Sequence, residues 1–465
     1  MTDTMENVRK VEEIVPDAAR TVASLRDIGY DTPRAIADLV DNSIAADATE
    51  VDITFTFDGE QSWIRVADNG VGMDGITLQE ALRYGSSREY SPDDLGKFGF
   101  GLKTASTSQC RRVTVASRCA RQNAILEVHV RCLDLGHIEE TSRWEILVPD
   151  DADQPEHVTA PLHDHTGTVV LWEDLDRILE YKDPWGEWAR KKLLSLAAEV
   201  DQHLAMVFHR FLSGEVKDRP PLRITINGKS KVEPWDPFCR SEPKTDQSIP
   251  AKDLKVAGDG GIGFVRVNSY VLPAQRDFSS DAAWHRASGP MQWNRQQGLY
   301  IYRANRMIQS GGWNRIRAQD EHTKLARMSL DFFPNLDSVF GINIAKAYVN
   351  LPQDLREQLQ PLIAQCTRSA DQKYRNDQPK SGIGGASAST VTARSTRKVR
   401  SDGGMEFGTG TFDPYGNRQD VARLRTAPRE AIEEVAEHVG ETVALQKIIG
   451  GLQARHPEVA RDLGW

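Results

Sequence analysis

Apolar residues recur with a helical period along residues 24–48 of the chain. Within TPRAIADLVDNSIAADA, which begins at Thr32, the apolar stripe consists of Ile36, Leu39, Val40 and Ile44. Pro33 suits the first turn of a helix, because backbone donors there have no partner inside the helix. The pattern therefore predicts an amphipathic helix that carries Asp38 and Asn42, four residues apart, on one polar face.

Alternating apolar and polar residues predict strands after this helix. VDITFTFDGEQSWIRVADNG, residues 51–70, alternates with period two on either side of Asp58-Gly59, which is typical of a hairpin. Further strands are expected at RVTVAS, AILEVHVRCL, RWEILVP and GTVVLWEDL, and a helix across residues 188–211. This first block is interpreted as a helix-and-sheet sandwich that ends near Gly214.

The second block is expected to combine strands with one long helix. Strand patterns occur at PLRITINGKSKVEPW, GFVRVNSYVLP, GLYIYRANRMIQ and AKAYVNLP, and a helix is predicted from about Gln353 to Tyr374. Residues 376–404 are rich in Gly, Ser and Thr, which predicts a flexible linker, and a helical period returns in the tail. The patterns predict an α+β protein with domains at residues 1–214 and 215–375, a linker at 376–404 and a small helical tail at 405–465.

Composition restricts the class of protein. With 39% hydrophobic and 27% charged residues the chain is typical of globular proteins, and no apolar run approaches the roughly 18 residues of a membrane span. Because no secretory signal is recognisable at the start, a cytoplasmic location without membrane contact is expected. The five cysteines have no CxxC spacing, which argues against a zinc site or a disulfide framework. A net charge of -9 argues against a uniformly basic nucleic-acid surface but leaves room for a local patch.

A short acidic and glycine-rich motif follows the first predicted hairpin. In VADNGVGMDG, residues 66–75, a strand delivers Asp68 and the chain then turns through Gly70 and Gly72. Glycine allows positive φ and a close approach of the backbone to a ligand, and a carboxylate can accept a hydrogen bond from the exocyclic amine of adenine. An Asp-Asn-Gly turn that ends a strand is also common without any ligand, so the motif alone leaves both interpretations open.

A second glycine-rich stretch, GKFGFGLKTAS at residues 96–106, begins like a Walker A phosphate loop. Leu102 separates Gly101 from the Lys103-Thr104 pair, and the preceding SSREYSPDD is polar and unlike a buried strand, so the Walker interpretation is rejected. The glycines nevertheless precede a helix-competent run. Backbone amides and the positive end of a helix dipole could therefore face a phosphate.

The order of these motifs, followed by HTGTVVLWEDL, resembles the GHKL ATPase superfamily, which includes gyrase, the ninety-kilodalton heat-shock chaperones, histidine kinases and MutL. SLRDIGYDTPRAIADLVDNSIAADA and GKFGFGLKTAS are most similar to prokaryotic relatives of the MORC ATPases. The resemblance covers about residues 24–352. It implies a Bergerat-fold ATPase domain followed by a transducer-like domain.

The resemblance also implies ATP and Mg²⁺ as cofactors and assigns roles to individual residues. It makes Asn42 the magnesium ligand, Asp68 the reader of adenine, Thr168 the support of Asp68 or of its bridging water, and residues 84–98 an ATP lid. The other residues that it places around the nucleotide are Gly70, Gly72, Met73, Ser86, Ser87, Gly96, Lys97, Phe98, Gly99, Phe100, Gly101, Leu102 and Lys103. Among these, Lys103 is the expected charged contact to phosphate.

Two catalytic positions follow from the same resemblance. The general base of the superfamily is typically Glu, and the matching residue here is Asp38, whose side chain is one methylene shorter, so slow turnover is expected. In the transducer-like domain Lys346 is expected to contact the γ-phosphate. SIAADA contains one residue more than the Ser-x-Asp-Ala of the family.

The leading functional hypothesis is a Mg²⁺-dependent ATPase that works as an ATP-operated homodimeric clamp, with residues 4–27 as a strap exchanged between protomers. The resemblance makes DNA and a partner effector protein candidate partners, including in antiviral defence. A nonhydrolysing, ATP-dependent scaffold for a partner protein is the alternative. A histidine kinase is disfavoured, because no histidine precedes Asp38.

Overall fold

The computed structural model describes residues 15–27, 30–84, 101–121, 124–180, 183–228, 230–258, 261–341 and 349–377, together with four isolated residues of the tail. The chain divides into two compact units, Met1–Gly382 and Ile383–Trp465. Nearly all described residues belong to the first unit, so the predicted linker and helical tail lie almost entirely outside them.

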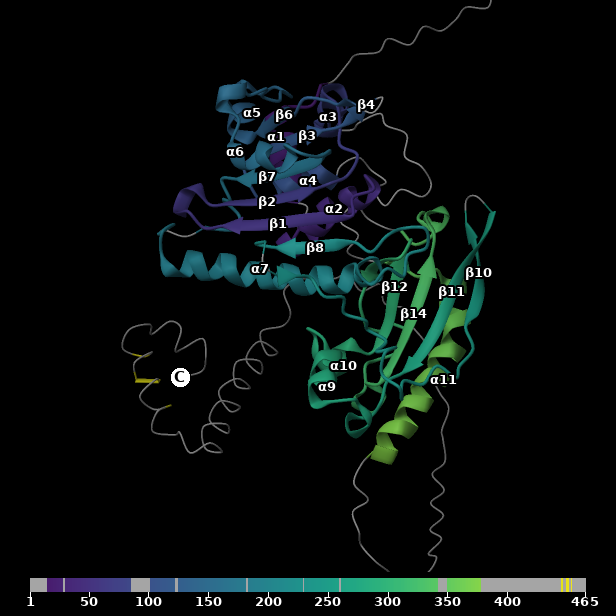
Figure 1. Ribbon diagram of the computed structural model, residues 1–465. Coiled ribbons are helices and arrows are strands. Elements are labelled where there is room, and N and C mark those ends of the chain that lie inside the picture. The colour runs from purple at the N-terminus through teal and green to yellow at the C-terminus, as the bar shows by residue number, and fades with distance from the viewer. Residues whose placement is uncertain are drawn as a thin grey trace, which may run out of the picture. The chain divides into compact units, whose positions relative to one another are not determined.

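A seven-stranded sheet organises the first half of this unit (Figure 1). In spatial order its strands are β6 (His129–Asp134), β3 (Arg112–Arg118), β7 (Gly167–Glu173), β2 (Trp63–Asp68), β1 (Glu50–Thr56), β8 (Arg223–Ile226) and β9 (Ser230–Lys231). Neighbouring strands are antiparallel except β1 and β8, which are parallel. The predicted hairpin at residues 51–70 is confirmed as β1–β2, in which Val51 lies opposite Asp68.

Both faces of this sheet are covered. Successive residues of β7 point to opposite faces, so Val170 and Trp172 join one core while Val169 and Leu171 join another. The first core includes residues of α1 (Ala18–Arg26), α2 (Thr32–Ala45), α3 (Gly75–Leu82), α4 (Gly101–Thr107), α5 (Leu135–Thr141), α7 (Glu187–Val207) and α8 (His209–Leu212). The second core includes Val158 of α6 (Glu156–Thr159). Two short strands, β4 (Ala120–Arg121) and β5 (Ala124–Ile125), form a separate hairpin.

Helix α2 forms where the apolar stripe predicts it. The Asp31 carboxylate caps its start by accepting a hydrogen bond from the Arg34 backbone N–H at 2.9 Å, and Pro33 occupies the first turn. The four residues of the predicted stripe are all buried in the first core. This packing fixes the polar face of α2, which carries Asp38 and Asn42.

Helix α1 occupies part of the segment predicted to be an exchanged strap. Ala18 and Val22 are buried in the first core of their own chain. Arg26 forms an ion pair with Asp176 at 2.6 Å and donates to the Thr107 carbonyl at 2.7 Å. Residues 18–26 are therefore docked on the half of their own chain that contains the seven-stranded sheet, and residues 4–14 of the predicted strap lie outside the described part of the chain.

Three sequence expectations differ from the structure. RWEILVP is not a strand and makes only a bridge between Leu147 and Cys132, because Trp144 and Val148 remain exposed instead of entering a core. The helix predicted across residues 188–211 is interrupted at Phe208 between α7 and α8. Strand β8 lies beyond the domain boundary predicted at residue 214, yet it pairs with β1 and completes the first sheet.

The second half contains a five-stranded sheet. In spatial order its strands are β10 (Lys252–Gly258), β11 (Gly261–Val271), β14 (Ala326–Phe332), β12 (Gly298–Arg303) and β13 (Arg306–Gln309). Helix α11 (Gln353–Asp377) packs on β10, β11 and β14, which confirms the helix predicted from about Gln353 (Figure 1). Helices α9 (Asp281–Ser288) and α10 (Gln292–Gln296) precede β12. The architecture is α+β, as predicted, and no helix among the described residues is long and apolar enough to span a membrane.

Candidate functional site

Asp68 ends β2 and is only 9% exposed. Its carboxylate accepts hydrogen bonds from the Ser43 hydroxyl at 2.8 Å, the Gly70 N–H at 2.9 Å and the Thr168 N–H at 3.2 Å. Burial raises the pKa of Asp68, and the three donors oppose this shift. Because an ionised carboxylate offers about four acceptor positions, three internal donors leave one position for a donor on a ligand.

The turn after Asp68 approaches its neighbours so closely that only glycine fits. Gly72 has φ +67°, and a Cβ atom there would lie 1.9 Å from the Arg118 carbonyl oxygen. A Cβ atom on Gly70 would lie 2.6 Å from the carbonyl oxygen of Ala46, which follows α2. The glycines therefore let the Asp68 turn lie directly against β3 and the end of α2.

Thr168 supports Asp68 through its backbone. Its N–H donates to Asp68, whereas its hydroxyl lies 2.9 Å from the Ser117 hydroxyl. Ser117 also accepts a hydrogen bond from the backbone N–H of Met73 at 2.8 Å. This cluster joins β7, β3 and the glycine turn, and it brings together the predicted residues Asp68, Met73 and Thr168.

Sequence reasoning missed two members of the cluster, Ser43 and Ser117. Ser43 directly follows Asn42 on α2, so its proximity to a predicted ligand was a usable signal. Ser117 carries no comparable signal, because only the register of β3 and β7 places it opposite Thr168.

Asp38 and Asn42 differ in exposure. Asp38 is 4% exposed and accepts a hydrogen bond from the Tyr30 hydroxyl at 2.9 Å, and a guanidinium nitrogen of Arg306 lies 3.5 Å from its other oxygen. Burial, and then the nearby Asp38 carboxylate, raise the pKa of Tyr30, which keeps its hydroxyl protonated as a donor. Asn42 lies one turn later on α2 and is exposed, so its amide oxygen is open to a ligand.

Lys103 lies on α4 and is 2% exposed. Its ammonium donates to the carbonyl oxygens of Ala81 at 3.0 Å and Arg83 at 2.6 Å, at the end of α3. Burial lowers the pKa of Lys103 to about 8. In this arrangement Lys103 anchors the chain immediately before the predicted lid, while its contact to phosphate stays a prediction.

Many of the predicted site residues lie outside the described part of the chain. These are Ser86, Ser87, Gly96, Lys97, Phe98, Gly99, Phe100 and Lys346. Of the lid predicted at residues 84–98, only Tyr84 is described. Gly101 and Leu102 begin α4, and Leu102 packs against the first core.

The residues that are described fit an adenine nucleotide with a divalent cation. Asp68 retains an acceptor position suited to an exocyclic amine, and the glycine turn beside it presents backbone rather than side chains. Across the described segments, no group of three or more His, Cys, Asp or Glu side chains is arranged to hold a metal ion. Mg²⁺ commonly takes only one or two protein ligands and completes its shell with substrate phosphates and water, which is compatible with Asn42 as a single ligand.

Comparison with known proteins finds a family whose matched range contains four of the predicted site residues. A family described as histidine kinase-, DNA gyrase B-, and HSP90-like ATPase matches residues 30–168. This range includes Asp38, Asn42, Asp68 and Thr168.

Three similar curated proteins are all named DNA mismatch repair protein MutL. The one from Histophilus somni is 36% identical over 105 residues, which is 22% of this chain and 17% of the relative. The one from Shewanella denitrificans is 39% identical over 99 residues, or 20% and 15% of the two chains, and the one from Shewanella pealeana is 36% identical over 124 residues, or 26% and 19%. The chain thus spans less than a fifth of the length of each of these relatives.

Proposed function

We propose, on the premise that residues 30–168 belong to the GHKL ATPase superfamily, that the chain binds ATP with Mg²⁺ and hydrolyses it slowly, as an ATP-operated dimeric clamp. The observation that carries this proposal is the Asp68 carboxylate, which is buried, held by three internal donors and still able to accept a further hydrogen bond. A buried carboxylate of this kind, beside a turn that allows close approach, suits an adenine ring.

The chain's own residues divide the work. Asn42 would hold the Mg²⁺ ion, which when bound neutralises charge on the triphosphate. Asp38 would orient the attacking water and accept its proton, with one carboxylate oxygen fixed by the Tyr30 hydroxyl. Lys103 and the α4 amides would contact phosphate, and Lys346 would reach the γ-phosphate from the second half of the chain.

The clamp is tested by the mass of the protein in solution. We expect sedimentation velocity to show a dimer when a nonhydrolysable ATP analogue and Mg²⁺ are added, because ordering of the lid would complete a surface for the second copy. The same protein without nucleotide serves as the control. A mass unchanged by the analogue, at concentrations where binding is saturated, would refute the clamp while leaving ATP binding intact.

Candidate partners are DNA and an effector protein. The similar proteins are named for DNA mismatch repair. The sequence also resembles prokaryotic relatives of the MORC ATPases, and on that resemblance a role in antiviral defence is proposed for this chain. The net charge of -9 does not favour a uniformly basic surface, so DNA contact would need a local patch. Retention on DNA, measured against salt concentration with and without ATP, tests this part of the proposal.

The second candidate function is a nonhydrolysing scaffold that binds ATP to organise a partner protein. The observation that favours it is the environment of Asp38, which is shorter than Glu and already engaged by Tyr30 and Arg306. If Asp38 is the base, Asp38→Asn should lower the ATPase rate roughly 100-fold, within the range of general-base effects, while analogue binding is retained.

Measured turnover separates the two functions. Phosphate release by the wild type and by Asp38→Asn gives the rate, and calorimetric titration with the analogue gives the affinity. A wild type that binds the analogue but releases no phosphate would favour the scaffold. Equal turnover of wild type and variant would remove Asp38 as the base.

A further inference from the structure

The β12–β13 hairpin of the second sheet reaches the helix that carries the candidate catalytic residue. Its two strands are joined by Ala304 and Asn305, which have φ of +46° and +69°. Positive φ at both central residues is typical of the tight hairpin turns that match strand twist. This turn places Arg306 at the start of β13, where it is only 5% exposed.

Arg306 bridges two buried carboxylates of α2. Its Nε atom lies 2.8 Å and 3.0 Å from the two oxygens of Asp41, and its Nη2 atom lies 3.5 Å from Oδ1 of Asp38. Asp38 and Asp41 are three residues apart on the helix and therefore face the same side. One guanidinium from the second sheet thus contacts both carboxylates, and both of these lie within one helical turn of Asn42 on α2.

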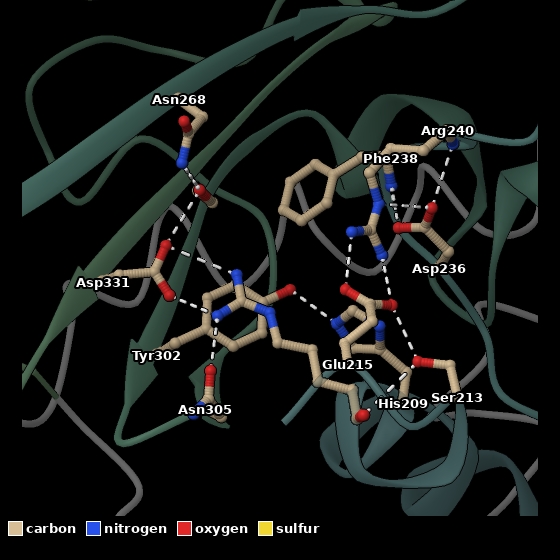
Figure 2. A network of polar contacts seen from close by, with 12 residues as sticks. His209, Ser213, Glu215, Asp236, Phe238, Arg240, Asn268, Tyr302, Asn305 and Asp331 are labelled. Atoms are coloured by element: carbon tan, nitrogen blue, oxygen red, sulfur yellow. Dashed lines mark hydrogen bonds and ion pairs between the residues drawn. The ribbon is translucent and has the colours of Figure 1, made fainter. Parts of the chain in front are cut away.

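The hairpin turn is held from a second direction. Arg210 of α8 donates to the Asn305 side chain at 3.4 Å and pairs with Asp331 of β14, and its guanidinium lies 3.6 Å from the Tyr302 ring centroid. His209 and the Tyr302 hydroxyl are 2.9 Å apart in the same network, which Figure 2 shows around Asn305 and Asp331. Because Asn305 immediately precedes Arg306, these contacts couple the position of Arg306 to both halves of the unit.

We propose that Arg306 is a positioning residue that couples the second sheet to the nucleotide site. The inference rests on the proposed function, because Asp38 matters to turnover only if the chain hydrolyses ATP. A movement of the β12–β13 hairpin relative to α2 must either carry the two carboxylates with it or break buried charge pairs. By thermodynamic linkage, nucleotide bound beside α2 then changes the stability of the hairpin, and the state of the hairpin changes the affinity for nucleotide by the same free energy.

Arg303 supplies a matched control on the same hairpin. It ends β12, three residues before Arg306, and is similarly buried. Its guanidinium pairs with the buried Asp337 carboxylate at 2.7 Å and 2.8 Å, within the second half of the chain. Arg303→Gln and Arg306→Gln therefore each remove a buried arginine from one hairpin, but only Arg306→Gln removes a bridge to α2.

The test combines amide hydrogen exchange with kinetics on the full chain. In the nucleotide-free protein, Arg306→Gln should speed exchange of the α2 amides roughly tenfold, whereas Arg303→Gln should leave them close to wild type. With the nonhydrolysable analogue bound, β12–β13 should gain protection in wild type and in Arg303→Gln but not in Arg306→Gln. Arg306→Gln should also lower turnover roughly tenfold and weaken analogue binding, because the coupling is reciprocal, whereas Arg303→Gln should leave both close to wild type.

The outcomes separate coupling from a general effect on folding. Equal exchange of α2 in the two variants, or retained protection of β12–β13 in Arg306→Gln, would overturn the proposal. If Arg306→Gln fails to fold, Arg306→Lys provides the same comparison, because an ammonium keeps the positive charge but cannot bridge the two carboxylates. For Arg306→Lys we expect α2 exchange rates faster than wild type but slower than the tenfold increase expected of Arg306→Gln. If the wild type binds no ATP, the proposed function fails, whereas the α2 exchange in nucleotide-free protein still decides whether Arg306 links the two elements.

Discussion

Asp68→Asn is expected to weaken ATP binding roughly 100-fold and to leave the fold intact. The amide oxygen can accept from the N–H groups of Gly70 and Thr168 as the carboxylate does, and the amide nitrogen can donate to the Ser43 hydroxyl. The substitution replaces one acceptor oxygen by an amide N–H donor. This donor would face the N–H of the adenine amine, so no hydrogen bond could form between them. Losing a charge-assisted hydrogen bond worth about 3 kcal/mol corresponds to roughly two orders of magnitude in affinity.

Titration calorimetry with the nonhydrolysable ATP analogue measures this loss, and thermal unfolding checks the fold. Asp134→Asn is a matched control, because Asp134 also ends a strand and accepts from the N–H two residues later, that of Gly136, at 2.8 Å. Asp134 pairs with Arg112 at the start of β3, far along that strand from Ser117 and the Asp68 cluster. Unchanged affinity in Asp68→Asn would mean that this carboxylate does not read adenine.

Gly72→Ala should destabilise the half of the chain that contains the seven-stranded sheet by about 3 kcal/mol or more, a large part of the 5–15 kcal/mol typical of a domain. Gly72 has φ +67°, which is unfavourable for alanine, and the added Cβ would overlap the Arg118 carbonyl oxygen at 1.9 Å. That neighbour is backbone and cannot rotate away. The turn would have to move from β3, which would also disturb the hydrogen bond from the Met73 N–H to Ser117.

Denaturant unfolding of Gly72→Ala measures the loss of stability. Gly101→Ala is the control, because a Cβ atom there would meet no atom of the described residues within 4 Å and Gly101 lies in α4, where alanine is the better helix former. The control should be at least as stable as wild type. A Gly72→Ala protein with wild-type stability would show that the turn does not pack on β3 as described.

The sequence alone predicted the elements whose signal is local. The stripe on α2, the alternation of β1 and β2 and the long helix α11 were all foreseen, because burial of one face imposes a period of 3.6 or 2 residues. The motifs within residues 30–168 also indicated the ATPase superfamily whose family model matches this range. The strand expected at RWEILVP was wrong: Ile146 packs against the first core, but Trp144 and Val148 on the same face remain exposed, and only Leu147 bridges to Cys132.

Only the tertiary structure decided which distant residues meet. Strand β8 joins the first sheet by pairing with β1, about 170 residues earlier, and the register of β3 against β7 brings Ser117 to Thr168. Arg306 reaches Asp41 across 265 positions of sequence. Periodicity reports which face of a segment is buried but not which segment buries it, so the residues that bind Asp68 and Asp38 from other elements became visible only when the chain was folded.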